Sequence, residues 1–139
     1  MSYNYWWMGF NQDRQLKCLQ VGDSKEIEAR GEQNLRANVK KIQIGDLVIA
    51  YEGDPEQRFT SVLVVTKLAN LDDENPVFSV RKVCDFKKMD ITFEFLTQFK
   101  DEFKDVIDAP RMGGQLIHSL TPEAFVDLLH FGMGWKEIR

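Results

Sequence analysis

The stretch IQIGDLVIAYEG, residues 42–53, carries the strongest secondary-structure signal in the chain. Gly45-Asp46 is typical of a turn, and the β-forming run from Leu47 to Tyr51 that follows is typical of a strand. Residues 58–68, RFTSVLVVTKL, form a second such run after a short connection. A short connection suits an antiparallel hairpin, so these two runs predict one.

Further strands are predicted on both sides of this hairpin, at residues 3–10, 77–86 and 115–119. In VFSVRKVCDF, residues 77–86, the apolar Phe78 and Val80 alternate with more polar neighbours, which predicts a half-buried strand. Residues 12–44 are polar and less regular, and short helices are expected around 13–19 and 32–40.

The second half of the chain predicts helices. One or two short helices are expected where aromatic and aliphatic residues recur at helical spacing, at Phe93, Leu96, Phe99 and Phe103. Thr121-Pro122-Glu123 is a strong helix start, with a hydroxyl N-cap, a proline at the first helical position and an acid in the first turn. Gly132 and Gly134 are expected to end this last helix.

Together these elements predict an α+β fold. The expected architecture is a curved, mostly antiparallel sheet of about five or six strands, wrapped by short helices, and its strand count and curvature suit a small β-barrel. The 139 residues and 43% hydrophobic content fit one compact domain over residues 1–139.

The adjacent tryptophans in the first predicted strand, Trp6 and Trp7, raise a specific question. Neighbouring side chains in a strand point to opposite faces, so the two rings cannot share one surface. One ring is expected in the barrel interior, and the other is expected either to line a pocket or to pack beneath a helix. The alternative is that both rings are core residues, covered on both sides of the sheet.

Catalytic and metal-binding signatures are nearly absent from the sequence. There is no GxSxG motif and no Gly-rich phosphate loop, and His118 and His130 are expected to be structural. Cys18 and Cys84 lie far apart and outside any CxxC motif, so two free thiols, no metal site and no cofactor are expected. The sequence predicts a protein that is not an enzyme.

Charge and hydropathy bear on whether the protein contacts membranes, is secreted or binds nucleic acid. No apolar run approaches the roughly 18 residues of a membrane span, and the N-terminus lacks the regions of a signal peptide, so a cytoplasmic protein with no membrane contact is expected. A net charge of −4 argues against a generic, charge-driven nucleic-acid binder. Basic residues nevertheless gather within residues 30–41 and 81–88, which permits a local basic face.

Four segments, in order along nearly the whole chain, resemble the EVE branch of the PUA-like superfamily. They are the N-terminal YWW with Asn11 after it, the stretch VKKIQIGDLVIAY at 39–51, VVTK at 64–67, and GGQLIHSLTPEAFVDLL at 113–129. The resemblance implies a β-barrel-like fold with flanking helices and a concave aromatic pocket. It also implies a reader that sandwiches a flipped, modified base on aromatic faces and bonds its edge.

Carried onto this sequence, the resemblance implies a set of pocket residues. Asn11 matches the polar residue that bonds the base edge, and the family's cage tryptophan is missing from EARGEQN at 28–34, where the guanidinium of Arg30 is the suggested substitute. The implied base pocket is Trp6, Trp7, Asn11, Arg30, Tyr51, Gly114 and Gln115. The implied phosphate contacts are Arg36, Lys40, Lys41, Arg81 and Lys82.

The function hypothesis is therefore a non-enzymatic nucleic-acid-binding module, for DNA or RNA, that recognises a modified, methylated base in an aromatic pocket. Because EVE modules are associated with restriction systems, fusion to or association with a nuclease or NTPase partner is part of this hypothesis. Two alternatives use the same pocket: a small-molecule or nucleotide-binding domain, and a protein-interaction module.

Overall fold

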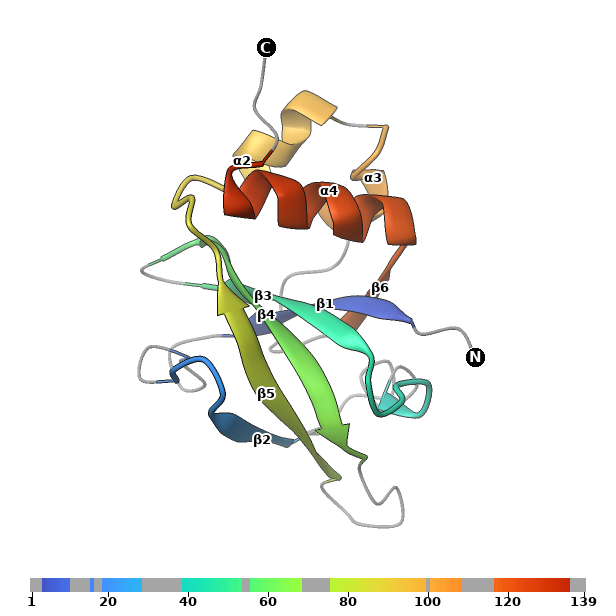
Figure 1. The fold of residues 1–139 in the computed structure, drawn as a ribbon. Helices are drawn as coiled ribbons and strands as arrows, with labels where there is room; N and C mark the ends of the chain where they lie inside the picture. The colour runs from blue at the N-terminus through green and yellow to red at the C-terminus, as the bar shows by residue number, and fades with distance from the viewer. Residues whose placement is uncertain are drawn as a thin grey trace.

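The computed structural model describes residues 4–10, 16, 19–28, 39–53, 56–68, 76–99, 101–108 and 117–135. Six strands form one mixed sheet in the order β2-β5-β4-β3-β1-β6, and the helices lie together on one side of it (Figure 1). The strands are β1 (Tyr5–Phe10), β2 (Ser24–Glu28), β3 (Leu47–Glu52), β4 (Arg58–Lys67), β5 (Val77–Asp85) and β6 (Ile117–Leu120). The helices are α2 (Phe93–Leu96), the 3-10 turn η2 (Thr97–Phe99), α3 (Lys104–Ile107) and α4 (Pro122–Met133).

The predicted hairpin is confirmed and occupies the middle of the sheet. β3 and β4 pair antiparallel, with Val48 opposite Leu63, and β4 continues antiparallel onto β5. β1 pairs with β3 in the parallel direction, with Trp7 opposite Ile49, whereas its ladder with β6 is antiparallel. The prediction of a mostly antiparallel sheet is therefore confirmed.

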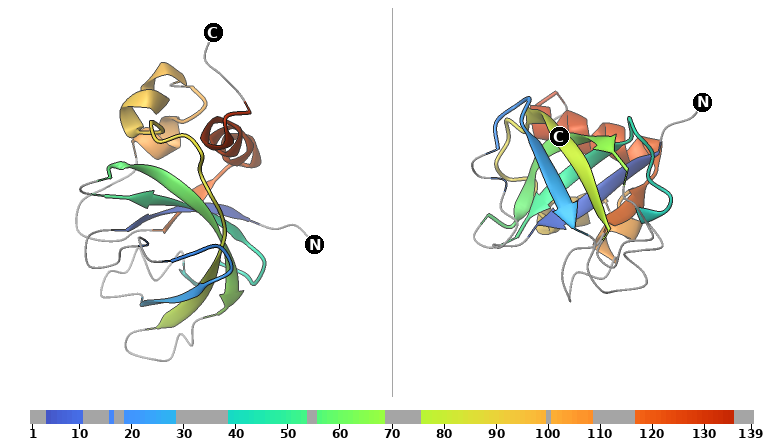
Figure 2. Two further views of the ribbon diagram at one scale, coloured as in Figure 1. Left: turned by 60° about the vertical axis from the view of Figure 1, so that its left-hand side comes forward. Right: turned by 90° about the horizontal axis from the view of Figure 1, so that it is seen from below.

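The predicted closure into a barrel is wrong for the part of the chain that the structure describes. The sheet is open there, and its two edges are β2 and β6. Both edges are short, with five and four residues, and in β2 only Ile27 is buried. The sheet still curls strongly, because Trp6 near one edge and Ile27 at the other pack in one hydrophobic cluster (Figure 2).

Strand alternation gives the sheet two separate cores. The first core lies on the face away from the helices and gathers Trp6, Met8, Phe10, Leu16, Ile27, Val39, Ile42, Val48, Ala50, Leu63, Val65, Phe78, Val80 and Ile117. The second core lies between the sheet and the helices, and includes Trp7, Ile49, Phe59, Val62, Phe103, Phe125 and Leu128. Trp6 and Trp7 are each 2% exposed and belong to different cores, so the sheet is covered on both faces at this point.

Two predictions about the segment before β3 have different outcomes. The helices expected around 13–19 and 32–40 fall mostly outside the described residues. β2 was missed, because a strand with the sequence SKEIE has one buried apolar side chain and carries no clear alternation.

A buried carboxylate fixes the turn between residue 42 and β3. Asp46 is 0% exposed and accepts hydrogen bonds from the indole Nε1–H of Trp6 at 3.0 Å, from the backbone N–H of Asn4 at 3.0 Å and from that of Gln43 at 2.9 Å. Its carbonyl accepts from the N–H of Val65 at 2.9 Å. One residue thereby joins β1, β3 and β4.

The last helix follows the sequence signals closely, with one correction. The Thr121 hydroxyl accepts from the N–H of Ala124 at 3.1 Å, and Gly134 ends the helix with φ of 75°. Gly132, expected to help end the helix, instead lies inside it and is buried. An added Cβ there would lie 2.3 Å from Cδ2 of Phe86, so glycine serves the close approach of the segment after β5.

We expect Asp46→Ala to lower the free energy of unfolding by about 3 kcal/mol or more, because three donors lose their acceptor in a buried position. Urea unfolding followed by circular dichroism measures this change. Asp101→Ala, at an exposed turn, is the matched control and should stay within about 0.5 kcal/mol. Equal effects of the two variants would contradict the role given to Asp46.

Gly132→Ala is expected to destabilise the fold by about 1–3 kcal/mol, although alanine favours helix more than glycine does. The cause is the clash with the ring of Phe86, so the same change should cost much less in a Phe86→Leu background. A double-mutant cycle from urea unfolding measures this coupling. Additive effects would show that Phe86 is not what restricts position 132.

Candidate functional site

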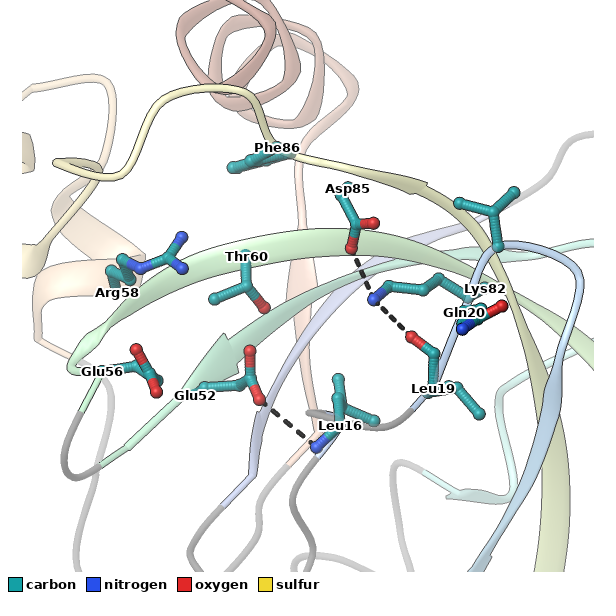
Figure 3. A pocket seen from close by; sticks show the side chains of 11 residues that line it. Leu16, Leu19, Gln20, Glu52, Glu56, Arg58, Thr60, Lys82, Asp85 and Phe86 are labelled. Carbon is teal, nitrogen blue, oxygen red and sulfur yellow. Dashed lines mark hydrogen bonds and ion pairs between the residues drawn. The ribbon is translucent and has the colours of Figure 1, made fainter.

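A polar cavity of about 410 Å³ opens where the β3–β4 hairpin meets the end of β5 and the residues that precede β2 (Figure 3). Leu16 on its wall belongs to the first core and Phe86 to the second. We call this cavity the hairpin pocket, and its lining residues are Leu16, Leu19, Gln20, Val21, Glu52, Glu56, Arg58, Thr60, Lys82, Asp85 and Phe86.

One end of the hairpin pocket is closed by an internal ion pair. The ammonium of Lys82 donates to the carbonyl of Leu19 at 2.8 Å and pairs with the carboxylate of Asp85 at 2.5 Å. The Lys82 side chain is 8% exposed, whereas that of Asp85 is 58% exposed. Lys82 therefore connects β5 to the segment before β2, and the nearby carboxylate of Asp85 balances its charge.

The other end of the hairpin pocket carries Glu52, Glu56 and Arg58 (Figure 3). Glu52 and Arg58 are direct partners across the hairpin ladder, so their side chains share one face. Oε1 of Glu52 accepts from the backbone N–H of Leu16 at 3.3 Å. Gln57, just before Arg58, has φ of 50°, and its N–H donates to the carbonyl of Gly53 at 3.2 Å.

An irregularity in the hairpin decides which side chains reach this pocket. The register of β3 and β4 shifts between Ala50 and Tyr51, so that Ala50 lies opposite Ser61 but Tyr51 lies opposite Phe59. Thr60 is the extra residue, and it is 7% exposed. A bulge of this kind re-aims the side chains that follow it.

An aromatic group lies on the opposite face of the sheet, beneath α2. The ring of Trp7 contacts Phe59 at 6.0 Å and Phe93 at 5.8 Å edge to face, and stacks on His118 at 4.5 Å. Tyr51 contacts Phe59 at 5.0 Å and Phe93 at 4.5 Å between ring centroids. Tyr51 and His118 are half-buried, so they form the accessible margin of the group.

The structure brings some predicted pocket residues together and separates others. Trp7 and Tyr51 share the aromatic group, whereas Trp6 lies on the other face, held by Asp46. Asn11, Arg30, Gly114 and Gln115 lie outside the described residues. Asn11 directly follows β1 and Gln115 comes two residues before β6, and these strand ends are neighbours because Met8 lies opposite Ile117.

The predicted phosphate contacts occupy different environments. Lys40 and Lys41 are exposed at the turn before Ile42, and Arg81 is exposed on β5. Lys82 points to the other face of β5 and is buried in the hairpin pocket. Arg36 lies outside the described residues.

Sequence reasoning missed the residues that make the hairpin pocket polar. Glu52, Arg58 and Asp85 each stand at the end of a predicted strand, where a charged residue is typical of solvent-exposed surface. Only Thr60 inside the apolar run 58–68 gave a signal, and a threonine is common in strands. These residues come together because of the order of the strands in the sheet, and neither the hydrophobic pattern nor the composition of the sequence predicts that order.

Cys84 is a free thiol, and burial, aided by the neighbouring carboxylate of Asp85, raises its pKa, so it is protonated at neutral pH. Among the described residues no group of His, Cys, Asp and Glu is arranged to hold a metal ion. No helix in those ranges is long and apolar enough to cross a membrane.

Comparison with known proteins gives a likeness of structure rather than of sequence. No protein-family profile and no curated protein matches the chain. The human THYN1 protein, solved in complex with 5-methylcytosine-containing DNA, superposes with a TM-score of 0.74 and 16% identity, over 97% of this chain and 99% of that one. The chain has the fold of this protein.

Other solved structures agree. The DUF55 domain of human thymocyte nuclear protein 1 matches with a TM-score of 0.70 and 15% identity, over 92% of this chain and 98% of the domain. A hypothetical protein from Leishmania major matches with a TM-score of 0.74 and 13% identity, over 98% of both chains. The predicted resemblance to the EVE branch of the PUA-like superfamily is confirmed at the level of the fold.

The two adjacent basic residues of β5 should respond differently to loss of charge. Lys82→Met leaves the Leu19 carbonyl and Asp85 without their donor, so the free energy of unfolding should fall by about 1–3 kcal/mol. Arg81→Met, on the exposed face, should change it by less than about 0.5 kcal/mol. Urea unfolding of both variants measures the difference, and equal changes would contradict an internal role for Lys82.

Proposed function

We propose that this chain is a non-enzymatic nucleic-acid-binding module that recognises a modified, methylated base. The observation that carries the proposal is the likeness over 97% of the chain to a protein solved with 5-methylcytosine-containing DNA. Half-buried Tyr51 supports the proposal, because stacking on aromatic side chains is the sequence-tolerant part of base binding.

The proposed reading site lies at the end of the sheet where β1 and β3 finish and β6 begins. Tyr51, near the end of β3, is the aromatic residue that we assign to it; its ring packs against Phe93, which contacts Trp7. The segments that carry Asn11, Gly114 and Gln115 join the sheet at this end, and Asn11 supplies both a donor and an acceptor for a base edge. Arg30 is included in this pocket on the resemblance alone.

Trp6 has an indirect part in this proposal. Its indole bond to Asp46 fixes β1 against β3 and β4, and so fixes the strand from which Asn11 extends. Trp6 is therefore a positioning residue, because the first core covers its ring.

Phosphate contacts are assigned to the exposed basic residues. Lys40, Lys41 and Arg81 are free to reach a backbone, and Arg36 belongs to the same basic cluster in sequence. The contribution of Lys82 is weaker, because Asp85 already balances its charge. Such contacts set the orientation of the strand, and the pocket sets the identity of the base.

The test is fluorescence anisotropy with short labelled DNA and RNA strands, each carrying one cytosine or one 5-methylcytosine, at two salt concentrations. We expect tighter binding of the methylated strand, a loss of about tenfold or more in Asn11→Ala and Tyr51→Ala, and weaker binding at higher salt. Lys40→Met should reduce the salt slope by about one, whereas Lys104→Met, exposed on α3, should leave it unchanged.

Absence of binding to every strand at low salt would refute the proposal. Equal binding of a free methylated nucleoside, with little dependence on salt, would favour the small-molecule alternative instead. Thermal unfolding of each variant controls for loss of structure, because Tyr51 packs against Phe59 and Phe93.

A further inference from the structure

We infer that the hairpin pocket takes the pairing edge of a guanine-type base, with Glu52 accepting from the ring N1–H and the exocyclic 2-amino group. The inference rests on the proposed function and extends it, because it gives the bound strand a second base contact. This contact lies on the sheet face opposite the aromatic group, in a cavity that the reading site does not use.

The charged side chains of the hairpin pocket fall into two groups. Among the described residues that line it, Glu52, Glu56 and Asp85 carry carboxylates, and Arg58 and Lys82 carry cations. The pair between Lys82 and Asp85 balances one charge of each sign and also occupies the carbonyl of Leu19. At the other end Glu52 lies opposite Arg58 in the ladder, so this end can accept from a ligand's N–H donors at Glu52 and donate from Arg58.

The carboxylate of Glu52 has the acceptor capacity for such a ligand. It accepts one long bond, from the N–H of Leu16 at 3.3 Å, whereas a carboxylate offers about four lone-pair sites. Glu52 is half-buried at the last position of β3, where neighbouring protein atoms already limit its access to water. Bonds to the charged group are therefore worth more than they would be on an open surface.

Among the common bases, the donor pattern selects guanine. Its pairing edge presents two adjacent donors, the N1–H and the 2-amino group, which match the two oxygens of one carboxylate. Adenine and cytosine present one donor beside an acceptor, and uracil and thymine present one donor between two acceptors. Arg58, the ladder partner of Glu52, supplies donors for the adjacent O6 of guanine.

The rest of the pocket suits the faces of a base. Leu16 and Leu19, which precede β2, and Phe86, which follows β5, supply apolar walls (Figure 3). Thr60, the extra residue of the bulge, lines the pocket between them. The cavity volume of about 410 Å³ lies within the roughly 300–1,000 Å³ of small-ligand pockets.

The test compares GMP with IMP, which lacks only the 2-amino group, and with CMP and UMP, by isothermal titration calorimetry at fixed salt. We expect GMP to bind about tenfold or more tightly than IMP, and UMP to bind least. Glu52→Gln should remove the GMP–IMP difference, while its amide oxygen can still accept from the N–H of Leu16. Glu26→Gln, exposed on β2, makes the same charge change outside the pocket and should preserve the difference.

Equal affinities for GMP and IMP in the unmodified protein, or an unchanged preference in Glu52→Gln, would overturn the inference. A second arm uses single strands with one 5-methylcytosine and either guanine or inosine at the neighbouring positions. If the methylated strand binds regardless of the neighbour and of Glu52→Gln, the proposed function stands and the guanine contact fails. If no strand binds while GMP keeps its preference, the pocket takes a free nucleotide and the proposed function fails.

Discussion

The carboxylate of Asp46 is the interaction on which the sheet depends. It accepts three hydrogen bonds from groups that lie up to 42 residues away in sequence, and its own carbonyl accepts from Val65. A fully buried carboxylate is tolerated only when its lone pairs are satisfied, so the turn, β1 and β4 must meet at this point for any of them to be stable there. The indole of Trp6 is the side-chain donor that brings β1 into register beside β3.

At the other end of the hairpin from Asp46, the bulge after Ala50 places aromatic side chains on one face of the sheet and charged side chains on the other. An unshifted register would continue from Ala50–Ser61 to place Tyr51 opposite Thr60. The shift instead places Tyr51 opposite Phe59 and Glu52 opposite Arg58. The aromatic pair then faces the helices and the charged pair faces the hairpin pocket. The neighbouring residues Tyr51 and Glu52 therefore point to opposite faces of the sheet, and each face carries one candidate site.

The sequence predicts elements whose signals are local, and fails where the structure depends on distant contacts. The hairpin, the half-buried β5 and the cap of α4 each follow from residues within a few positions of one another. β2 forms because β5 offers it an edge, although its own sequence contains a single buried apolar residue. The roles of Asp46 and Glu52 come from partners that are far apart in the chain, and Gly132 is required by a ring 46 positions earlier. The resemblance predicted the fold, but it did not predict the hairpin pocket.

The distribution of charge on this protein indicates which interactions would bind a nucleic-acid strand. A chain with a net charge of −4 gains little binding free energy from counterions released by the nucleic acid. The charge of Lys82 is already paired with that of Asp85. Most of the binding free energy in the proposed complex must therefore come from stacking and from bonds to base edges. Carboxylates at a nucleic-acid surface oppose affinity unless they accept bonds from bases, and in that case they improve discrimination, because a wrong base leaves them unsatisfied. A half-buried carboxylate such as Glu52 in the hairpin pocket is consistent with a protein that favours selectivity over strength of binding.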